Sequence, residues 1–310
     1  MVKIGKSDVN ATALGLGTNA VGGNNLFPNL KDETGIQIVK TALDSGITLL
    51  DTAFAYGMGH SEELIGQAIQ GYDRSKFVIA TKAAQDTSNG DVTINNNPEF
   101  LKQSVEDALK RLQTDYIDIF YIHFPDDQTP KDQAVAALNE LKEAGKIKAI
   151  GVSNFSLDQI KEANKDGLVD VVEDQYSLIH RENEDVMFDY LRDNNISFVP
   201  FFPLASGLLT GKYAEVVDFP ENDIRNGNPD FTGDRFASIV EKVNSLKPMA
   251  EKHGVDVAQL VLAWYIANPN ISIVIPGAKH PEQVEKNAQA LKVQLSDDEY
   301  KEIDNTFKNI

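Results

Sequence analysis

Three short apolar runs in the first half of the chain each end in a titratable residue. Asp51 follows the run TLL, Lys82 follows VIAT, and His123 follows IFYI. Tyr56 comes shortly after Asp51. If the runs are strands of one parallel barrel, their carboxyl ends meet on one rim. We therefore expect these four side chains to converge there.

Together, these four residue types make an acid that can act on a carbonyl group. A free tyrosine has a pKa of about 10, too high for an effective acid near neutrality. The ammonium of Lys82 stabilises the phenolate of Tyr56, and Asp51 keeps that ammonium charged and in place. His123 can donate a hydrogen bond to a carbonyl oxygen as negative charge develops on it. No side chain donates hydride, so carbonyl reduction here requires a cofactor.

Each of the four residues also has an ordinary structural interpretation. Asp51 can cap a turn, Lys82 can be solvated, His123 can be a hydrogen-bonded core residue, and Tyr56 can be a rim aromatic. These interpretations do not explain why the four occur at successive strand ends, and their joint occurrence favours a catalytic site.

Strand-like and helix-like segments alternate along the whole chain, which predicts a parallel sheet of βαβ units. The expected strands are 13–17, 48–51, 77–81, 117–121, 147–152, 171–174, 197–201 and 271–275. The expected helices are 32–45, 61–69, 98–112, 131–144, 157–163, 185–193, 236–253, 257–267 and 282–290. Eight units in this length suit a closed (β/α)8 TIM barrel, forming one domain over residues 1–310.

A doubly wound Rossmann sheet is the alternative fold. It requires a G-x-G-x-x-G turn after an early strand. Gly15 and Gly17 are followed by Ala20 where that turn needs its third glycine, so the barrel is favoured.

Three segments depart from simple alternation. Residues 3–5 and 10–13 are expected to form an N-terminal β-hairpin that plugs one end of the barrel. The long segment 208–234 is weakly periodic, and loops of such length are usually functional or disordered. A C-terminal helix is expected to begin at Ser296 and to cover residues 295–307, with acidic residues in its first turn.

Composition excludes several classes of function. The formal net charge is −18, whereas nucleic acids and anionic membranes require a basic binding surface. With no cysteine, the chain has no disulfide, thiolate nucleophile or zinc–thiolate site. No signal peptide or membrane span is recognisable, so we expect a cytoplasmic protein. The five histidines show no H-x-H or H-E-x-x-H spacing, which disfavours a metal-dependent hydrolase or isomerase, and no metal is expected.

Several segments resemble the aldo-keto reductase family. They are LLDTAFAYGMGHSEELIG (49–66), VIATK (78–82), DIFYIHFPD (118–126) and GVSNF (151–155), and they occur in the family's order and spacing between about residues 14 and 290. The resemblance implies that Tyr56 is the proton donor. It further implies that Lys82 and Asp51 set the pKa of that tyrosine, and that His123 orients the carbonyl.

The resemblance also implies an NADP cofactor, with NADPH preferred over NADH. Its nicotinamide carboxamide would be held by Ser153, Asn154 and Gln175, with Phe201 stacked on the ring. Phe202 stands where the family often has a small residue.

PLASGLLTGK (203–212) resembles the family's pyrophosphate loop, and IPGAKHPEQVEKN (275–287) resembles its 2′-phosphate site. In these two segments the expected cofactor contacts are Pro203, Leu204, Ser206, Leu208, Thr210, Lys212, Gly277, Lys279, Gln283 and Asn287.

Two interpretations of the function remain open. The first is an NAD(P)H-dependent reductase of aldehydes or ketones. The second is a non-catalytic NADPH-binding regulatory subunit of the same fold, such as those of ion channels, for which an intact Asp–Tyr–Lys–His set would have no use. For the first interpretation, Phe27, Phe54, Phe124 and Phe201 favour a hydrophobic small-molecule carbonyl substrate. The sequence does not give the oligomeric state.

Overall fold

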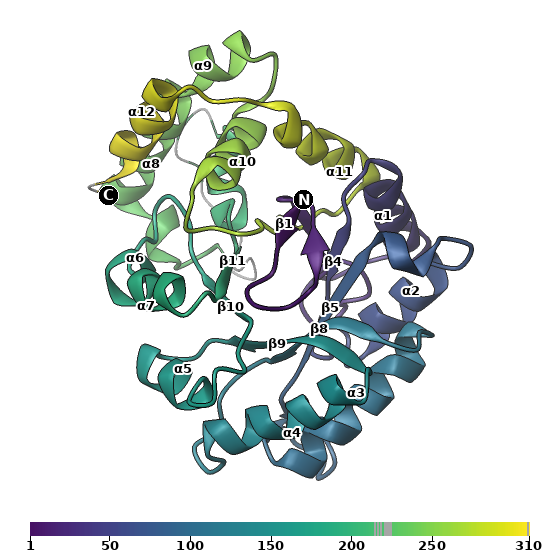
Figure 1. The fold of residues 1–310 in the computed structure, drawn as a ribbon. Coiled ribbons are helices and arrows are strands. Elements are labelled where there is room, and N and C mark those ends of the chain that lie inside the picture. Colours follow the sequence, from purple (N-terminus) through teal and green to yellow (C-terminus); the bar gives the residue numbers. More distant parts are fainter. Residues whose placement is uncertain (214, 216, 218, 220–224, 309) are drawn as a thin grey trace.

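The core of the computed structural model, which describes residues 1–310 except 214, 216, 218, 220–224 and 309, is a ring of parallel strands surrounded by helices (Figure 1). Seven strands pair in parallel in the order β3-β4-β5-β8-β9-β10-β11. Their bounds are β3 Gly15–Gly17, β4 Leu49–Asp51, β5 Val78–Ala83, β8 Ile117–Ile122, β9 Ile147–Ser153, β10 Val171–Gln175 and β11 Ser197–Phe201. This is the expected (β/α)8 barrel.

The eighth strand is less regular than the expected strand 271–275. The segment forms two isolated parallel bridges to the β3 side, Leu14 to Val274 and Gly17 to Gly277. On its other side, Ser272 donates to the carbonyl of Phe198 in β11 at 2.9 Å. Pro276 has no N–H to donate to a ladder, which limits regular pairing here. The segment nevertheless closes the ring between β11 and β3.

The helices follow the expected pattern closely. They are α1 Asp32–Asp44, α2 His60–Ala68, α3 Pro98–Leu112, α4 Lys131–Glu143, α5 Leu157–Ala163, α6 Asn183–Val186, α7 Phe188–Asp193, α8 Gly233–Ser245, α9 Lys247–Lys252, α10 Val257–Ala267, α11 Pro281–Ala288 and α12 Asp297–Phe307. Short 3₁₀ turns are η1 Arg74–Lys76, η2 Ala205–Thr210, η3 Pro229–Phe231 and η4 Gln289–Lys292.

Two expected helices are interrupted. The expected helix 236–253 divides into α8 and α9 because Pro248 has no N–H for the carbonyl of Asn244. The expected helix 185–193 divides into α6 and α7 at Met187, whose φ is −129°. The C-terminal helix α12 begins after Ser296 as expected, with a capping box between Ser296 and Glu299.

The N-terminal hairpin closes one end of the barrel, as expected. Strands β1 Val2–Lys3 and β2 Asn10–Ala11 pair antiparallel and lie over the centre of the ring (Figure 1). Ile4 is fully buried in the same apolar cluster as the inward residues of the strands. Gly5 donates to the Ser197 hydroxyl at 2.8 Å, at the start of β11. The hairpin therefore seals the amino ends of the strands and leaves the carboxyl ends open for a site.

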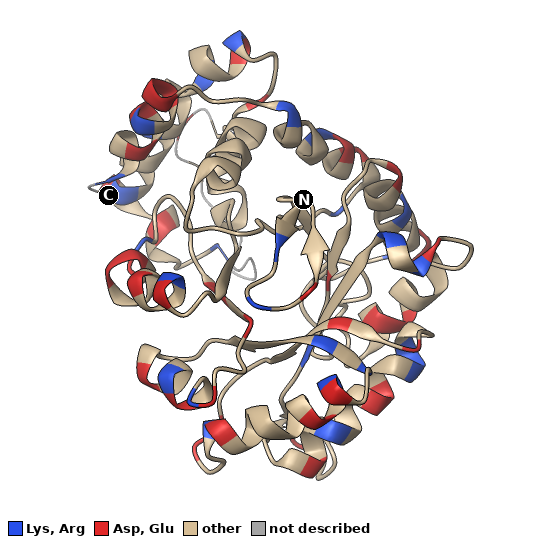
Figure 2. Cartoon of the chain, in the orientation of Figure 1, with Lys and Arg blue, Asp and Glu red and all other residues tan. Residues whose placement is uncertain are grey.

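Charged residues lie mainly on the outer helices and connecting loops, whereas the strands are largely uncharged (Figure 2). Within the described part of the chain, no helix is long and apolar enough to cross a membrane. A second small hairpin lies after β5, where no strand was expected, and joins β6 Gln85–Asp86 to β7 Thr93–Ile94. Part of the expected loop 208–234 lies outside the described residues.

Candidate active site

The four candidate catalytic residues meet at the carboxyl ends of neighbouring strands. Asp51 is the last residue of β4, Lys82 lies near the end of β5, and His123 directly follows β8. Tyr56 lies in the loop between β4 and α2. Strand pairing places β5 between β4 and β8, so Lys82 lies between the aspartate and the histidine.

Lys82 is the centre of a buried ionic cluster. Its Nζ donates to Asp51 Oδ1 at 2.5 Å and to the backbone carbonyl of Thr52 at 3.0 Å. It also lies 3.2 Å from Oε1 of Glu173. The three side chains are at most 2% exposed. The two carboxyl groups hold the ammonium in one place and outweigh the effect of burial, so the pKa of Lys82 is raised and it stays protonated.

Glu173 belongs to this cluster, although sequence reasoning did not select it. It lies on β10, paired in register with Ser153 of β9. The sequence signal was its position in the strand. Because side chains alternate between the two faces of a strand, Glu173, two residues after the buried Val171, points to the same inward face. An acidic residue at an inward position of an apolar strand requires a partner, and Lys82 supplies it.

Tyr56 lies above the cluster with its hydroxyl unengaged. Its ring centroid is 5.8 Å from Lys82 Nζ and 6.4 Å from the His123 ring, which it meets edge-on. No described residue hydrogen-bonds to the hydroxyl, which is thus available to an incoming oxygen. Burial raises the pKa of Tyr56, and the charge of Lys82 opposes this rise. A negative charge on Asp51 or on Glu173 adds to it.

His123 is held as a neutral imidazole. Burial, with the nearby Lys82 charge, lowers its pKa to about 3. Its ring stacks on Phe124, with centroids 4.6 Å apart, and Gln85 Nε2 lies 3.4 Å from Nδ1. When Nδ1 accepts from the Gln85 amide, Nε2 carries the proton of the neutral ring. A neutral donor beside Tyr56 suits binding of a carbonyl oxygen.

The residues expected to hold a nicotinamide lie on the same rim, but Gln175 is more exposed than Ser153 and Asn154. Ser153 ends β9 and is buried, and Asn154 beside it donates to its hydroxyl at 3.0 Å. Phe201 ends β11 and is half-buried, and its ring meets that of Phe202 edge-on at 5.3 Å. Gln175 lies farther out, exposed at the end of β10, whereas Glu173 is the β10 residue level with Ser153.

The segment expected to wrap a pyrophosphate has an unusual backbone. Phe202, Ala205 and Ser206 all have positive φ, at 55°, 44° and 53°. Left-handed residues cost of order 1–3 kcal/mol each and cluster at ligand sites. Pro203 and Leu208 are buried, and Leu204 packs against the core. Thr210 donates a hydrogen bond to the carbonyl of Gly207. The side chains of Ser206 and Lys212 are exposed to solvent. This loop therefore presents a strained backbone, a hydroxyl and an ammonium.

The expected 2′-phosphate segment forms the turn into α11. The Gln283 side chain accepts hydrogen bonds from the backbone N–H groups of Lys279 and His280, at 2.7 and 3.2 Å. Gly277 and Lys279 are exposed, and Asn287 is buried in the last turn of α11. The Lys279 ammonium lies 4.4 Å from the Phe27 ring centroid and forms no ion pair with any described residue. It is thus available to an anion.

A family model described as "Aldo/keto reductase family" matches residues 13–307. The chain belongs to the aldo/keto reductase family. It is similar to aldo-keto reductase YhdN of Bacillus subtilis, with 37% identity over 99% of this chain and 93% of the relative. It is also similar to the NADH-specific methylglyoxal reductase of Escherichia coli, with 32% identity over 96% of this chain and 94% of the relative.

Among solved structures, the chain resembles the glycerol dehydrogenase of Gluconobacter oxydans. The TM-score is 0.90 at 32% identity, over 98% of this chain and 94% of that one. As a member of the aldo/keto reductase family, the chain is an oxidoreductase that reduces carbonyl groups with a nicotinamide cofactor. The relatives differ in the cofactor that their names give, since the Escherichia coli reductase is named as specific for NADH and an aldo-keto reductase of Schizosaccharomyces pombe, 33% identical over 95% of this chain and 88% of the relative, is named with NADP(+).

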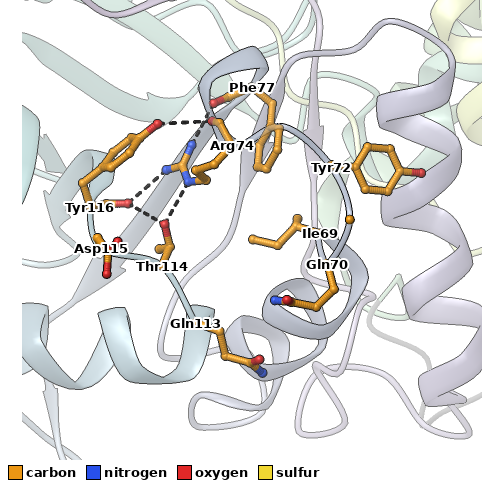
Figure 3. A pocket seen from close by; sticks show the side chains of 10 residues that line it. Ile69, Gln70, Tyr72, Arg74, Phe77, Gln113, Thr114, Asp115 and Tyr116 are labelled. Atoms are coloured by element: carbon orange, nitrogen blue, oxygen red, sulfur yellow. Dashed lines mark hydrogen bonds between the residues drawn. The ribbon is translucent and has the colours of Figure 1, made fainter.

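Two of the cavities that the described residues form lie outside this aldo/keto reductase site. One, of about 310 Å³, lies at the amino ends of β5 and β8, and the Arg74 side chain forms part of its lining (Figure 3). That guanidinium donates to Thr114, to the carbonyls of Phe77 and Tyr116, and to Asp118. Its donors are used in structure, and this end of a barrel generally serves stability.

The second cavity, of about 890 Å³, lies on the open rim. It is formed by the β6–β7 hairpin and residues 125–130, and most of its lining side chains are polar. Asp126 organises this rim, accepting hydrogen bonds from the backbone of Asn96 and Thr129 at 2.7 Å each.

Proposed function

We propose that this chain is an NADPH-dependent reductase of aldehydes or ketones in which Tyr56 is the proton donor. The observation that carries the proposal is the buried Lys82, held 2.5 Å from Asp51 below the unengaged hydroxyl of Tyr56. A purely cofactor-binding protein has no use for a desolvated ion cluster at that position.

When bound, the nicotinamide supplies the hydride that no side chain can give. His123 donates a hydrogen bond to the carbonyl oxygen and so favours the growing negative charge. Tyr56 gives its proton to the same oxygen, and the Lys82 ammonium stabilises the phenolate left behind. One hydride and one proton thus convert the carbonyl to an alcohol, and solvent returns a proton to Tyr56 before the next turnover.

The residues expected to bind the cofactor suit its charge and polarity. Ser153 and Asn154 offer a hydroxyl and an amide to the carboxamide, and Gln175 stands outside them on the rim. The strained loop 202–211 offers backbone N–H groups to a pyrophosphate. Lys279 offers its ammonium to a 2′-phosphate, which is the basis for preferring NADPH over NADH. The absence of cysteine agrees with action in the reducing cytoplasm.

We further propose that the substrate is a hydrophobic, preferably aromatic, carbonyl compound. Phe124 stacks on His123, and Phe201 ends β11 on the same rim. Phe54 and Phe27 are engaged by cations, Arg111 at 5.1 Å and Lys279 at 4.4 Å. Phe124 and Phe201 are accordingly the aromatic residues we assign to substrate and nicotinamide.

The test is NADPH consumption with a reactive aromatic aldehyde, comparing the wild type with Tyr56→Phe. We expect turnover in the wild type and a loss of about 10³-fold in kcat in the variant, because a positioned acid typically contributes 10²–10⁴-fold. NADPH binding, measured by fluorescence, should be unchanged in the variant. If both proteins bind NADPH tightly and neither reduces any member of a carbonyl panel, the regulatory-subunit interpretation replaces ours.

A further inference from the structure

Two buried carboxyl groups compete for one cation below Tyr56. Lys82 Nζ contacts Asp51 Oδ1 at 2.5 Å and Glu173 Oε1 at 3.2 Å. If both acids were ionised, the cluster would carry a net negative charge inside the barrel. Such an uncompensated charge is far more costly than a protonated acid. The chemistry proposed for Tyr56 requires the pair Asp51 and Lys82 but leaves Glu173 without a role.

The remaining oxygens of the two acids show how the conflict is resolved. Asp51 Oδ2 and Glu173 Oε2 are both buried and have no donor among the described residues. Both acids contact the same buried nitrogen, so their free oxygens lie in the same dry space around Lys82. Two buried carboxylate oxygens without a donor are compensated when one of the acids carries a proton, which its hydroxyl can offer to the other acid. Carboxyl pairs sharing one proton are a known solution to this arrangement.

We propose that Glu173 is held as a neutral carboxylic acid that donates its proton to Asp51 Oδ2, and that it positions Lys82 while leaving the cluster without net charge. The proton is assigned to Glu173 because the shorter contact of Lys82 is to Asp51, which is therefore the better-stabilised carboxylate. Glu173 touches neither substrate nor reacting atoms, so it is a positioning residue.

The surroundings of Glu173 agree with this assignment. Burial and the neighbouring Asp51 raise the pKa of Glu173 well above its ordinary value, and Lys82 opposes the rise only in part. The other titratable groups that face it are Tyr121 on β8 and Tyr56 above the cluster, and both are neutral at ordinary pH because burial raises the pKa of each. Neither tyrosine supplies a positive charge that would favour the Glu173 carboxylate.

The proton on Glu173 matters for Tyr56, and this step rests on the proposed function. An ionised Glu173 raises the pKa of Tyr56 and cancels part of the Lys82 field. A neutral Glu173 leaves one carboxylate for one ammonium, so Lys82 acts on the phenolate at full strength. As pH rises and Glu173 loses its proton, Tyr56 becomes a weaker acid, and reduction slows.

The first test does not depend on activity. Infrared difference spectra between wild type and Glu173→Gln should show a protonated carboxyl C=O band at pH 7 that belongs to the wild type and disappears in alkali. Asp174→Asn is the matched control on the same strand, because its side chain does not contact Lys82, and it should keep the band. If the Glu173→Gln substitution disturbs folding, Glu173→Met provides the same comparison. A band that survives in the folded variants, or no band at all, overturns the proposal.

The second test uses the pH profile of carbonyl reduction. We expect kcat of the wild type to fall by about tenfold between neutral and alkaline pH, and the fall to be absent in Glu173→Gln but present in Asp174→Asn. Identical profiles in all three proteins would overturn the positioning role. If no carbonyl is reduced by any of them, the proposed function fails, while the infrared result still decides the protonation of Glu173.

Discussion

Asn154 donates a hydrogen bond from Nδ2 to the backbone carbonyl of His123, at 3.1 Å. The same amide group donates to Ser153 Oγ at 3.0 Å. A residue expected to hold the nicotinamide carboxamide is therefore tied directly to the strand end that carries the candidate carbonyl-orienting histidine. Through this contact, the Asn154 side chain supports both the proposed cofactor site and the strand end that carries His123.

This contact predicts different effects for two substitutions of Asn154, whose φ is 60°. Asn154→Gly keeps the left-handed backbone but loses the amide, so we expect a higher KM for NADPH and a lower kcat. Asn154→Ala loses the amide and also strains the backbone by about 1–2 kcal/mol. Steady-state kinetics and thermal unfolding separate the two effects. Equal unfolding temperatures for both variants would contradict the backbone part of the argument.

A second prediction concerns the protonation of His123, whose pKa is lowered to about 3. The folded protein should keep this imidazole neutral from pH 8 to pH 5, whereas in the unfolded chain it titrates near 6.5. Its contribution to stability is therefore full above about pH 6.5 and is lost as pH falls towards 3. NMR titration of the histidine ring signals, with His123→Phe for assignment, should show that the His123 ring does not titrate in this range.

The positions of the proposed catalytic residues were predictable from sequence because they follow recognisable strands. Asp51, Lys82 and His123 come directly after apolar runs, and the barrel places such residues on one rim. The family resemblance added the cofactor residues, and the family itself is confirmed by the comparisons. The roles of the individual residues stay predictions.

Features that depend on tertiary contacts were not predictable. The partner of Glu173 became visible only in the folded structure, because its inward position in VVED indicates that a partner is needed but not that this partner is a lysine more than ninety positions away. The eighth strand was expected to be regular, yet its pairing depends on closure of the ring around Pro276. The break between α8 and α9 was indicated by Pro248, but the helical periodicity on both sides concealed it.

The third prediction tests cofactor preference at Lys279. This ammonium has no ion-pair partner among the described residues, so its removal should not disturb the fold. We expect Lys279→Met to raise the Kd for NADPH by about tenfold, which corresponds to about 1.4 kcal/mol, and to leave the Kd for NADH nearly unchanged. Lys286→Met is the matched control on α11, since that lysine pairs with Asp256 at 2.8 Å. An equal loss of affinity for both cofactors would place Lys279 away from the 2′-phosphate.

The last prediction separates the stability end of the barrel from the proposed catalytic end. Arg74 closes the cavity between the starts of β5 and β8 and lies beside Tyr116 (Figure 3), with its guanidinium 4.2 Å from that ring's centroid. Its Nη2 lies 2.6 Å from the buried carboxylate of Asp118. Among the described residues, Arg74→Met leaves Asp118 with only Lys148, at 3.1 Å, and the backbone N–H of Ile79. Because removing one partner of a buried ion pair costs about 3–5 kcal/mol, we expect the free energy of unfolding to fall by about 3 kcal/mol in urea titrations.

Lys76→Met, an exposed substitution in the same 3₁₀ turn, should change the free energy of unfolding by less than about 0.5 kcal/mol. Neither variant should change kcat/KM for a carbonyl substrate at a temperature where both are folded, because the hairpin β1–β2 seals this end of the barrel from the catalytic rim. A loss of turnover in Arg74→Met at unchanged stability would show instead that this cavity communicates with the site.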